Sequence, residues 1–296
     1  MNKGYCYMFL TAICWSLAGV LIRFNGQTGL MISTICSFIA FLFNILFYRR
    51  KWILNTTVIF VTICQYIMGI TFVYANQLTT VGNAIVLQYT SMIFVLLYQS
   101  IDERRFPKRR QIGVVFMVVF GMFLFFFDHI SLKGMIGNVL AIISGLFFGL
   151  QFYVNSKEQA DAYTSTQLSY LISVLGICLV FRDLSTIQTT EWIVMVISGV
   201  VQTALGGIFF AKGIILIQAF TANVICMSEI LLAPLWAYLF FCETISFMSL
   251  VGGVIIIIGI LLNITFDYFE NKMINLMNKY EESKNYQLNT MIFHTN

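Results

Sequence analysis

The residue best placed to do chemistry is Glu229, a carboxylate near the middle of a long apolar run, Thr221–Phe241. A carboxylate at bilayer depth costs on the order of 3 kcal/mol by insertion scales. Pro234 follows in the same run, and a proline removes a backbone donor and tends to kink a helix. This combination favours a helix that lines a polar cavity, where Glu229 would gate, bind a substrate amine or carry a proton. The alternative is a protonated Glu229 that is hydrogen-bonded inside a packed bundle.

Helical spacing places further residues on the same face as Glu229. Residues three or four apart in sequence share one face of a helix. The resulting stripe is small, small, acidic, small and aromatic: Ala222, Cys226, Glu229, Ala233 and Trp236. Small side chains beside the carboxylate leave room either for another helix or for a ligand, and both remain open.

Other polar and aromatic side chains also lie inside apolar runs, where polar groups often mark a transport pathway. An amide can bind either end of an amino acid, because it carries both donors and an acceptor. Taken singly, each amide is better explained by an interhelical hydrogen bond worth about 0.6 kcal/mol. Taken together, they favour a cavity. With Glu229 and Trp236, the predicted substrate-binding or gating set contains Trp15, Gln65, Asn83, Gln88, Gln151 and Gln202.

Motifs for catalysis, nucleotide binding or metal binding are missing from the sequence. The two histidines, His129 and His294, lie outside the apolar runs, and H-E-x-x-H, Walker and G-x-S-x-G patterns are absent. The seven cysteines lie in or at the edges of apolar runs without a CxxC, which is typical of small buried side chains. We therefore expect neither an enzyme nor an ATP-driven pump, and we expect no metal and no cofactor.

Composition identifies the chain as an all-α polytopic membrane protein. Of its 296 residues, 59% are hydrophobic and 10% are charged, whereas soluble domains carry about 25% charged residues. The apolar runs are long and continuous, which excludes the short alternating strands of a β-barrel. The net charge of +4 lies in short loops, where it orients a membrane protein, and it gives no reason to expect nucleic acid as a partner.

Ten apolar segments have about the length that crosses a bilayer. The first follows only Lys3, but Arg23 comes directly after it and no A-x-A cleavage site is present, so we expect a retained helix. The segments are Gly4–Ile22, Gly29–Tyr48, Val58–Ala75, Val81–Gln99, Gln111–Phe127, Gly134–Val154, Ser165–Phe181, Trp192–Ala211, Thr221–Phe241 and Met248–Phe266. Gly145 and Gly149 form a G-x-x-x-G pattern, which is typical of close helix packing.

The distribution of basic residues predicts the orientation of these segments. With the N-terminus inside, every Lys and Arg falls on the inner side except Arg23, Lys133 and Arg182. Cytoplasmic loops of membrane proteins carry such an excess. We therefore predict ten spans, both termini in the cytoplasm and insertion in the cytoplasmic membrane.

An internal repeat relates the two halves of the chain. Because each half holds five spans, an odd number, the second copy must enter the membrane upside down, which is a common transporter architecture. We predict two inverted five-helix repeats at 1–127 and 128–266 and a cytoplasmic tail at 267–296. A shift of 140 residues places Asn83 on Asn223, Tyr89 on Glu229, Glu103 on Glu243 and Gly113 on Gly253.

The tail begins with apolar residues at helical spacing, in Phe266–Tyr280. Such a segment is either an amphipathic helix on the inner membrane surface or an extension of the last helix. The last ten residues are expected to be disordered.

These features resemble the drug/metabolite transporter superfamily, in particular the ten-helix EamA-type carriers. The resemblance covers about residues 4–266: Ile217–Leu262 and Thr79–Leu124 are similar to the family's Ala-rich hairpin, Pro-bearing helix, acidic turn and Gly-rich helix, and CWSLAGVLIRF from Cys14 is similar to its opening helix. Two departures stand out. The fourth segment lacks the family's proline, with Met92 and Phe94 in that region, and the turns read Cys242–Glu243 and Asp102–Glu103 instead of Gly-Glu.

The resemblance implies export of small metabolites, often amino acids, through a cavity between the halves. We therefore expect a secondary transporter that works by alternating access. Its expected partners are a small-molecule substrate and the lipid bilayer, as a monomer or weak homo-oligomer. The alternative is a non-transport membrane protein on the same fold, for lipid handling or assembly.

Overall fold

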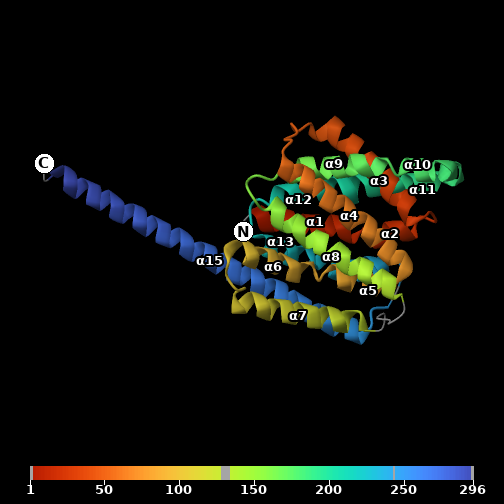
Figure 1. Ribbon diagram of the computed structural model, residues 1–296. Helices are drawn as coiled ribbons and strands as arrows, with labels where there is room; N and C mark the ends of the chain where they lie inside the picture. Colours follow the sequence, from red (N-terminus) through yellow and green to blue (C-terminus); the bar gives the residue numbers. More distant parts are fainter. Residues whose placement is uncertain (1–2, 128–133, 243, 295–296) are drawn as a thin grey trace.

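The computed structural model describes residues 3–127, 134–242 and 244–294, and it folds them into helices without a strand in these ranges (Figure 1). The first half contains α1 (Lys3–Ser16), α2 (Ala18–Arg23), α3 (Gly29–Phe43), the π-helix η1 (Asn44–Tyr48), α4 (Thr56–Leu78), α5 (Val81–Gln88), α6 (Ser91–Glu103) and α7 (Arg109–Phe125). The second half contains α8 (Met135–Asn155), α9 (Ala162–Val174), α10 (Ile177–Val180), the 3₁₀-helix η3 (Phe181–Thr186), α11 (Thr189–Ile197), the π-helix η4 (Ser198–Leu205), α12 (Gly206–Gly213), α13 (Ala219–Cys226), α14 (Ser228–Phe241) and α15 (Phe247–His294).

Eight helical segments of the described chain are long and apolar enough to cross a membrane. They are Lys3–Arg23, Gly29–Tyr48, Thr56–Leu78, Val81–Glu103, Met135–Asn155, Thr189–Gly213, Ala219–Phe241 and Phe247–Glu270. Two further predicted spans form shorter helices: α7 has 17 residues and α9 has 13 before α10 begins. Seventeen residues lie at the lower end of the spanning range. An all-α multi-pass membrane protein is confirmed, while ten spans stay a prediction.

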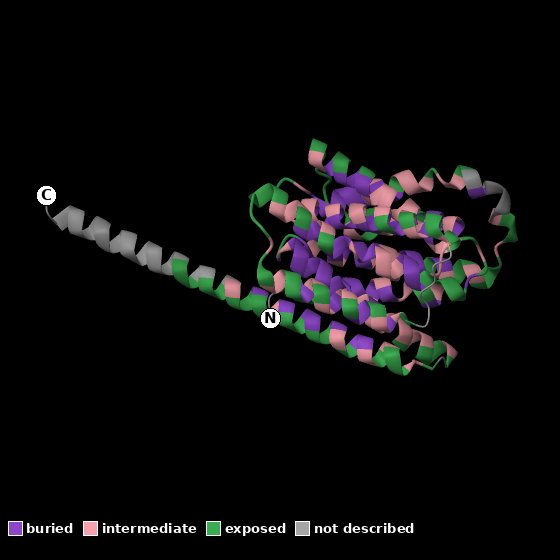
Figure 2. Ribbon diagram, turned by 60° about the horizontal axis from the view of Figure 1, so that its bottom comes forward, coloured by how far each residue is buried: buried purple, intermediate pink, exposed green. Residues whose placement is uncertain are grey.

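Burial follows the pattern of a protein whose solvent is lipid. Buried residues lie inside the bundle and exposed residues cover its outer surface (Figure 2). The exposed side chains on the spans include large apolar ones such as Phe47, Phe116 and Leu261. Apolar side chains on the outside of a helical bundle are stable in hydrocarbon but not in water.

An aromatic cluster joins the two halves at the centre of the bundle. The ring centroids of Trp15 lie 5.9 Å from Phe148 and 5.7 Å from Phe210, and Phe152 lies 5.1 Å from Phe210. Tyr89 lies 6.0 Å from Phe148. These distances are within the range of favourable aromatic pairs, so residues far apart in sequence form one core.

The G-x-x-x-G pattern of α8 brings this helix close to α5 and α6, as expected. A Cβ atom on Gly145 would lie 2.7 Å from the carbonyl oxygen of Gln88, and one on Gly149 would lie 2.7 Å from that of Ser91. Only glycine allows two backbones to approach this closely.

Besides the first span, which changes from α1 to α2 at Leu17, two spans are broken at almost equivalent positions of the two halves. The fourth span changes from α5 to α6 at Tyr89 and Thr90, and the ninth changes from α13 to α14 at Met227. At the second break the N–H of Ile230 donates to the carbonyl of Met227, three residues back instead of four. The proline expected to kink this span, Pro234, lies within α14 beyond the break. A break in a membrane helix leaves backbone groups and helix ends that face the protein interior.

The helices α7 and α15 pack against each other in opposite directions. The hydroxyl of Ser249, near the start of α15, donates to the carbonyl of Phe125 at the end of α7, 2.7 Å away. Further along, Gly121 lies against Gly252, and Gly259 lies against Val118. The contact between Val118 and Gly259 joins residues that are related by nearly the 140-residue shift of the repeat.

The C-terminal tail continues α15 as one helix of 48 residues that projects from the bundle (Figure 1). The expectation that the last ten residues are disordered is therefore wrong for 287–294. No glycine or proline follows Gly259, so the sequence holds none of the residues that most often end a helix. Of the two alternatives for the tail, the structure has the extension of the last helix.

The close contact between α7 and α15 predicts different effects for two adjacent glycines. A Cβ on Gly252 would lie 2.5 Å from the carbonyl oxygen of Gly121 and from the amide nitrogen of Phe125, whereas one on Gly253 would have its nearest neighbour at 3.4 Å. Backbone atoms cannot move aside easily, so we predict that Gly252→Ala destabilises the protein by about 1–3 kcal/mol. Gly253→Ala is the matched control and should be neutral or slightly stabilising, because alanine favours helices. Thermal unfolding in detergent, followed by tryptophan fluorescence, measures both; equal melting temperatures would contradict this packing.

Candidate functional site

The candidate site lies where the two broken spans meet. Tyr89 is the residue at which α5 ends, and Glu229 lies in the first turn of α14. The hydroxyl of Tyr89 donates a hydrogen bond to the carboxylate of Glu229. Tyr89 is fully buried and Glu229 is partly buried. An acidic side chain in the first turn also interacts favourably with the helix dipole, so two features hold the carboxylate.

This contact joins two residues that the predicted repeat relates to each other. Tyr89 and Glu229 coincide under its 140-residue shift, and in a repeat of inverted halves equivalent residues can touch only near the axis that relates the halves. Tyr89 was not in the predicted site set. The repeat was the signal that could have found it, because it paired the tyrosine with the one deep carboxylate.

A second polar link between the halves lies close to the first. The amide nitrogen of Asn223 donates to the hydroxyl of Ser91 over 3.1 Å, and both residues are buried. Cys226, on the same helix as Asn223, is also buried and lies 3.8 Å from the carbonyl of Met8. Every residue of α13 is buried. The half of this span on the predicted inner side is therefore tightly packed.

The other half of the span is packed more loosely. Beyond Ile230, no described residue of α14 is buried, and the same holds for Gln65–Tyr74 of α4. A Cβ atom on Gly19 or Gly69 would have no neighbour within 4 Å. A helix in a closed bundle normally buries one face, so these segments, on the predicted outer side, are less enclosed than α13.

Asn83 and Gln88 attach α5 to α8. The amide nitrogen of Gln88 donates to the hydroxyl of Ser144 over 3.0 Å, and that of Asn83 donates to the side-chain oxygen of Asn138 over 3.1 Å. Neither forms a hydrogen bond that joins it to Glu229 in the described structure. These bonds match the alternative that explained each amide by interhelical hydrogen bonding.

The remaining three amides form no hydrogen bonds with one another in the described structure. The side-chain oxygen of Gln65 accepts from the hydroxyl of Thr166 at 3.3 Å, and that of Gln202 accepts from Ser198, one turn away in η4, at 2.6 Å. Gln151 is buried, and its side-chain oxygen has no hydrogen-bond partner in the described structure. A buried unpaired oxygen is a place where an ordered water or a ligand donor would bind.

The two tryptophans of the predicted set take different positions. Trp236 donates its indole N–H to the hydroxyl of Ser16 over 2.8 Å, which ties α14 to the end of α1. Trp15 belongs to the aromatic cluster and connects through Phe148 to Tyr89. The structure thus gathers Glu229, Tyr89 and the aromatic cluster around the break, and it spreads the amides over neighbouring helix contacts.

Glu229 lines neither of two hollows that lie among the described residues. The larger, of about 590 Å³, opens at the predicted inner face and is lined by residues of both halves, including Gln99, Glu103, Lys108, Lys157 and Gln218. It lies on the same side as the tightly packed α13. Among the described residues, no three His, Cys, Asp or Glu side chains lie close enough to hold a metal ion.

Comparison with known proteins agrees with this architecture. A solved structure, described only as the crystal structure of a protein, matches with a TM-score of 0.72 at 11% identity and covers 89% of this chain and 98% of that chain; this likeness concerns the fold alone. An uncharacterized transporter of Archaeoglobus fulgidus is 25% identical over 270 residues, which are 88% of this chain and 96% of that protein.

The sequence model of the EamA-like transporter family matches residues 2–127 and again residues 135–265. Two successive matches of this kind suggest a repeat, and together they cover most of the chain. The chain belongs to the EamA-like transporter family of the drug/metabolite transporter superfamily, which is a family of transporters and not of enzymes.

Proposed function

We propose that the protein is a secondary transporter that exports a small organic metabolite across the cytoplasmic membrane, with amino acids as the first class to test. Family membership supports transport. The observation that carries the site is the hydrogen bond between Tyr89 and Glu229 at the junction of two broken spans. Broken helices that meet inside a bundle are where many secondary transporters bind their substrates.

The proposed topology is two inverted five-helix repeats, 1–127 and 128–266, with ten spans and both termini in the cytoplasm. The antiparallel packing of α7 against α15 supports it, and so do the breaks at nearly equivalent positions. The repeats would meet at an axis near two contacts, Tyr89 with Glu229 and Val118 with Gly259. Both α7 and α9 must then cross the membrane although they are short.

Cysteine labelling tests whether α7 and α9 span. Arg105 and Glu158 precede these helices on the predicted inner side, and Met135 and Gln188 follow them on the outer side; all four residues are exposed. In a background without native cysteines, we predict that Arg105→Cys and Glu158→Cys react with a membrane-impermeant maleimide only after the cells are opened. Met135→Cys and Gln188→Cys should react in intact cells. If the two sites around one helix reacted from the same side, that helix would not span.

Alternating access requires that each side of the protein can close. The ion pairs among the described residues lie at the predicted inner face, where the ammonium of Lys157 lies 2.6 Å from the carboxylate of Asp102, between the two proposed halves. The tail adds contacts there: Tyr5 donates to Asp267 over 2.5 Å, and Lys108 and Arg110 form ion pairs with Glu270. Together with the buried α13 and the less enclosed α14, these ion pairs favour an arrangement that is closed on the inner side.

The strength of these ion pairs suits a closure that must open again. The hydrogen bond to Asp102 raises the pKa of the Lys157 ammonium, so Lys157 stays charged at physiological pH. Exposed pairs of this kind typically contribute only about 0–1 kcal/mol each. Several of them bias the closed arrangement, and each can break without a large barrier.

A crosslink across this face should stop transport. We predict that Asp102→Cys/Lys157→Cys, joined by a short cleavable dithiol crosslinker, loses flux and regains it when the crosslinker is cleaved. Each single cysteine variant treated with the same reagent is the control, in a background where exposed Cys6, Cys178 and Cys242 are serine. Full flux through the crosslinked protein would argue against opening at this face.

The proposed role of Glu229 is to bind the substrate amine or to carry the proton that drives export. A carboxylate that accepts a hydrogen bond from Tyr89 can exchange this partner for an ammonium group or for a proton. Hydrogen bonds to charged groups contribute about 1.5–3 kcal/mol, so the exchange is energetically significant. Glu229 is partly buried at the start of the less enclosed α14, and in this proposal a ligand reaches it from the predicted outer side.

Flux of a labelled amino-acid panel into proteoliposomes tests this role. We predict that Glu229→Gln loses about tenfold or more in flux or loses its pH dependence, and that Tyr89→Phe has a smaller effect because the carboxylate remains. Glu191→Gln, which removes an acid at the predicted outer edge, is the matched control. Unchanged flux of Glu229→Gln at every pH would remove this residue from the mechanism. If the wild type moves no amino acid, other metabolites come next, and if none is moved, a non-transport role in lipid handling or assembly gains support.

A further inference from the structure

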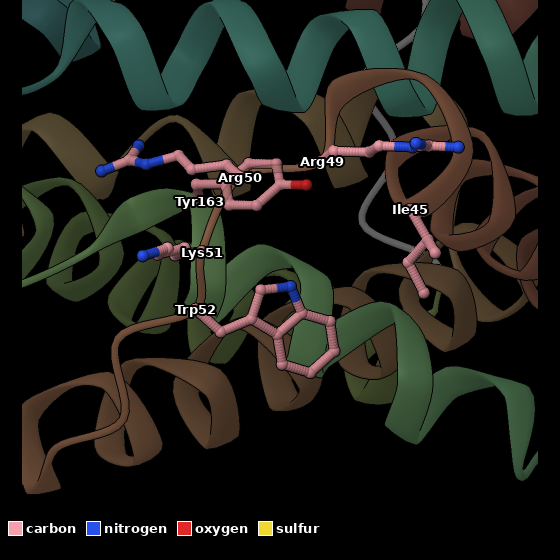
Figure 3. A pocket seen from close by; sticks show the side chains of 6 residues that line it. All are labelled: Ile45, Arg49, Arg50, Lys51, Trp52 and Tyr163. Carbon is pink, nitrogen blue, oxygen red and sulfur yellow. The ribbon is translucent and has the colours of Figure 1, made fainter.

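A second hollow lies on the predicted inner face, and no residue of the broken spans lines it. Figure 3 shows the side chains that line this hollow. We propose that it binds the headgroup of an anionic glycerophospholipid of the inner leaflet. Its volume is about 390 Å³, and its lining is Ile45, Arg49, Arg50, Lys51, Trp52 and Tyr163. The assignment to the inner leaflet rests on the topology proposed above, whereas the binding itself requires no transported substrate.

The loop that forms this hollow is held in place by bonds to the second half of the chain. Arg50 forms an ion pair with Asp161 at 2.8 Å, and its guanidinium lies 5.7 Å from the ring centre of Tyr163. The amide of Ile53 donates to the hydroxyl of Thr164 over 3.1 Å. Asn55 caps the following helix through a bond to the amide of Val58 over 2.8 Å. The hollow is therefore formed by a fixed loop before any ligand arrives.

Two cations of the hollow have no acidic partner among the residues that the structure describes. Asp161 neutralises Arg50, but within the described residues no acid forms an ion pair with Arg49 or Lys51. Arg49 donates through Nε to the carbonyl of Leu46 over 3.0 Å, which leaves its terminal nitrogens for other acceptors. In Figure 3 the side chains of Arg49 and Lys51 extend from the loop in different directions, with Trp52 below them. The hollow thus carries a net positive charge on more than one side.

The backbone at Arg49 contributes to this placement. Arg49 follows the π-helix η1 and adopts a left-handed conformation with φ of 42°. Non-glycine residues adopt this conformation infrequently. It turns the chain sharply, so that Arg49, Arg50 and Lys51 follow the end of the helix without continuing it.

The surroundings indicate a lipid rather than a soluble anion. Trp52 packs at 6.2 Å from the ring of Phe41, and tryptophan favours the membrane interface. Next to the basic residues, large apolar side chains are exposed: Ile45, Leu46, Phe47, Ile53 and Leu54. An anionic phospholipid satisfies both parts, with its phosphate at the cations and its acyl chains along the apolar residues. Basic pockets at the cytoplasmic side of transmembrane helices bind such headgroups.

Quenching of Trp52 by brominated lipids tests the proposal. The full chain is placed in phosphatidylcholine nanodiscs that contain a minor fraction of brominated phosphatidylglycerol or the same fraction of brominated phosphatidylcholine. The difference between wild type and Trp52→Phe isolates the signal of Trp52 from the other three tryptophans. We expect the anionic lipid to quench Trp52 several-fold more strongly than the neutral one.

Charge removal at the hollow should abolish this preference. Each basic side chain near an anionic surface contributes about fivefold in affinity, so Arg49→Gln/Lys51→Gln should bring the ratio of the two quenching strengths close to one. Arg104→Gln/Arg109→Gln is the matched control, because it removes the same charge from the same predicted face. Neither Arg104 nor Arg109 lines either hollow, and Arg104 resembles Arg49 in its left-handed backbone, with φ of 51°. Equal melting temperatures would show that the variants are equally stable, so that a difference in quenching reports lipid binding.

Three results would overturn the proposal. Equal quenching of the wild type by both lipids would mean that no anionic lipid is selected. An equal loss in the control variant would assign the preference to the charge of the whole face and not to this hollow. Displacement of the lipid by inorganic phosphate, but not by chloride at the same ionic strength, would indicate a soluble anion as the ligand. None of these results depends on whether Glu229 takes part in transport.

Discussion

The interaction on which the central architecture depends is the hydrogen bond from Tyr89 to Glu229. A carboxylate in the hydrocarbon region is costly unless a polar partner accompanies it. Here the partner comes from the other half of the chain, at the position that the repeat makes equivalent. The bond therefore both satisfies a buried polar group and joins the halves at their proposed axis. Ser91 and Asn223 form a second link of this kind close by, in this case between α6 and α13.

The breaks in the two spans follow from the same constraint. A continuous helix satisfies its own backbone and leaves nothing for a ligand, whereas a broken helix frees backbone groups and creates a new N-terminus. In the ninth span, that N-terminus begins at Ser228, directly before Glu229. The carboxylate is thus placed where a helix end and a tyrosine both stabilise it. A ligand cation or a proton arriving there competes with groups that are already in position.

The sequence allowed some of these features to be predicted, and the physical reason differs for each. The length of the apolar runs and the placement of the charges predicted the helices, because a bilayer admits few structures other than long apolar helices. The 140-residue shift paired Tyr89 with Glu229 before their contact was known. The break at Met227 could not be predicted, because the visible breaker in that span is Pro234. The amides also escaped prediction: Gln88 and Asn83 bond to α8, and a lone polar residue on a helix does not reveal which neighbour it faces. The end of the tail was missed because polarity suggested disorder, although no residue there stops a helix.

The distribution of charge explains why the two faces of the protein differ. Basic residues gather on the predicted inner side, so acids there find basic partners: Asp102 and Asp161 across the proposed repeats, and Glu270 of the tail at Arg110. The outer side has few basic residues and cannot form an equivalent set; there Glu191 accepts hydrogen bonds from the amide of Gly26 and the side chain of Gln27 instead. The charge distribution that sets the predicted orientation thus also supplies the ion pairs at the predicted inner face. The two predicted faces of the bundle are therefore held by different interactions, ion pairs on the inner side and hydrogen bonds from uncharged donors to Glu191 on the outer side.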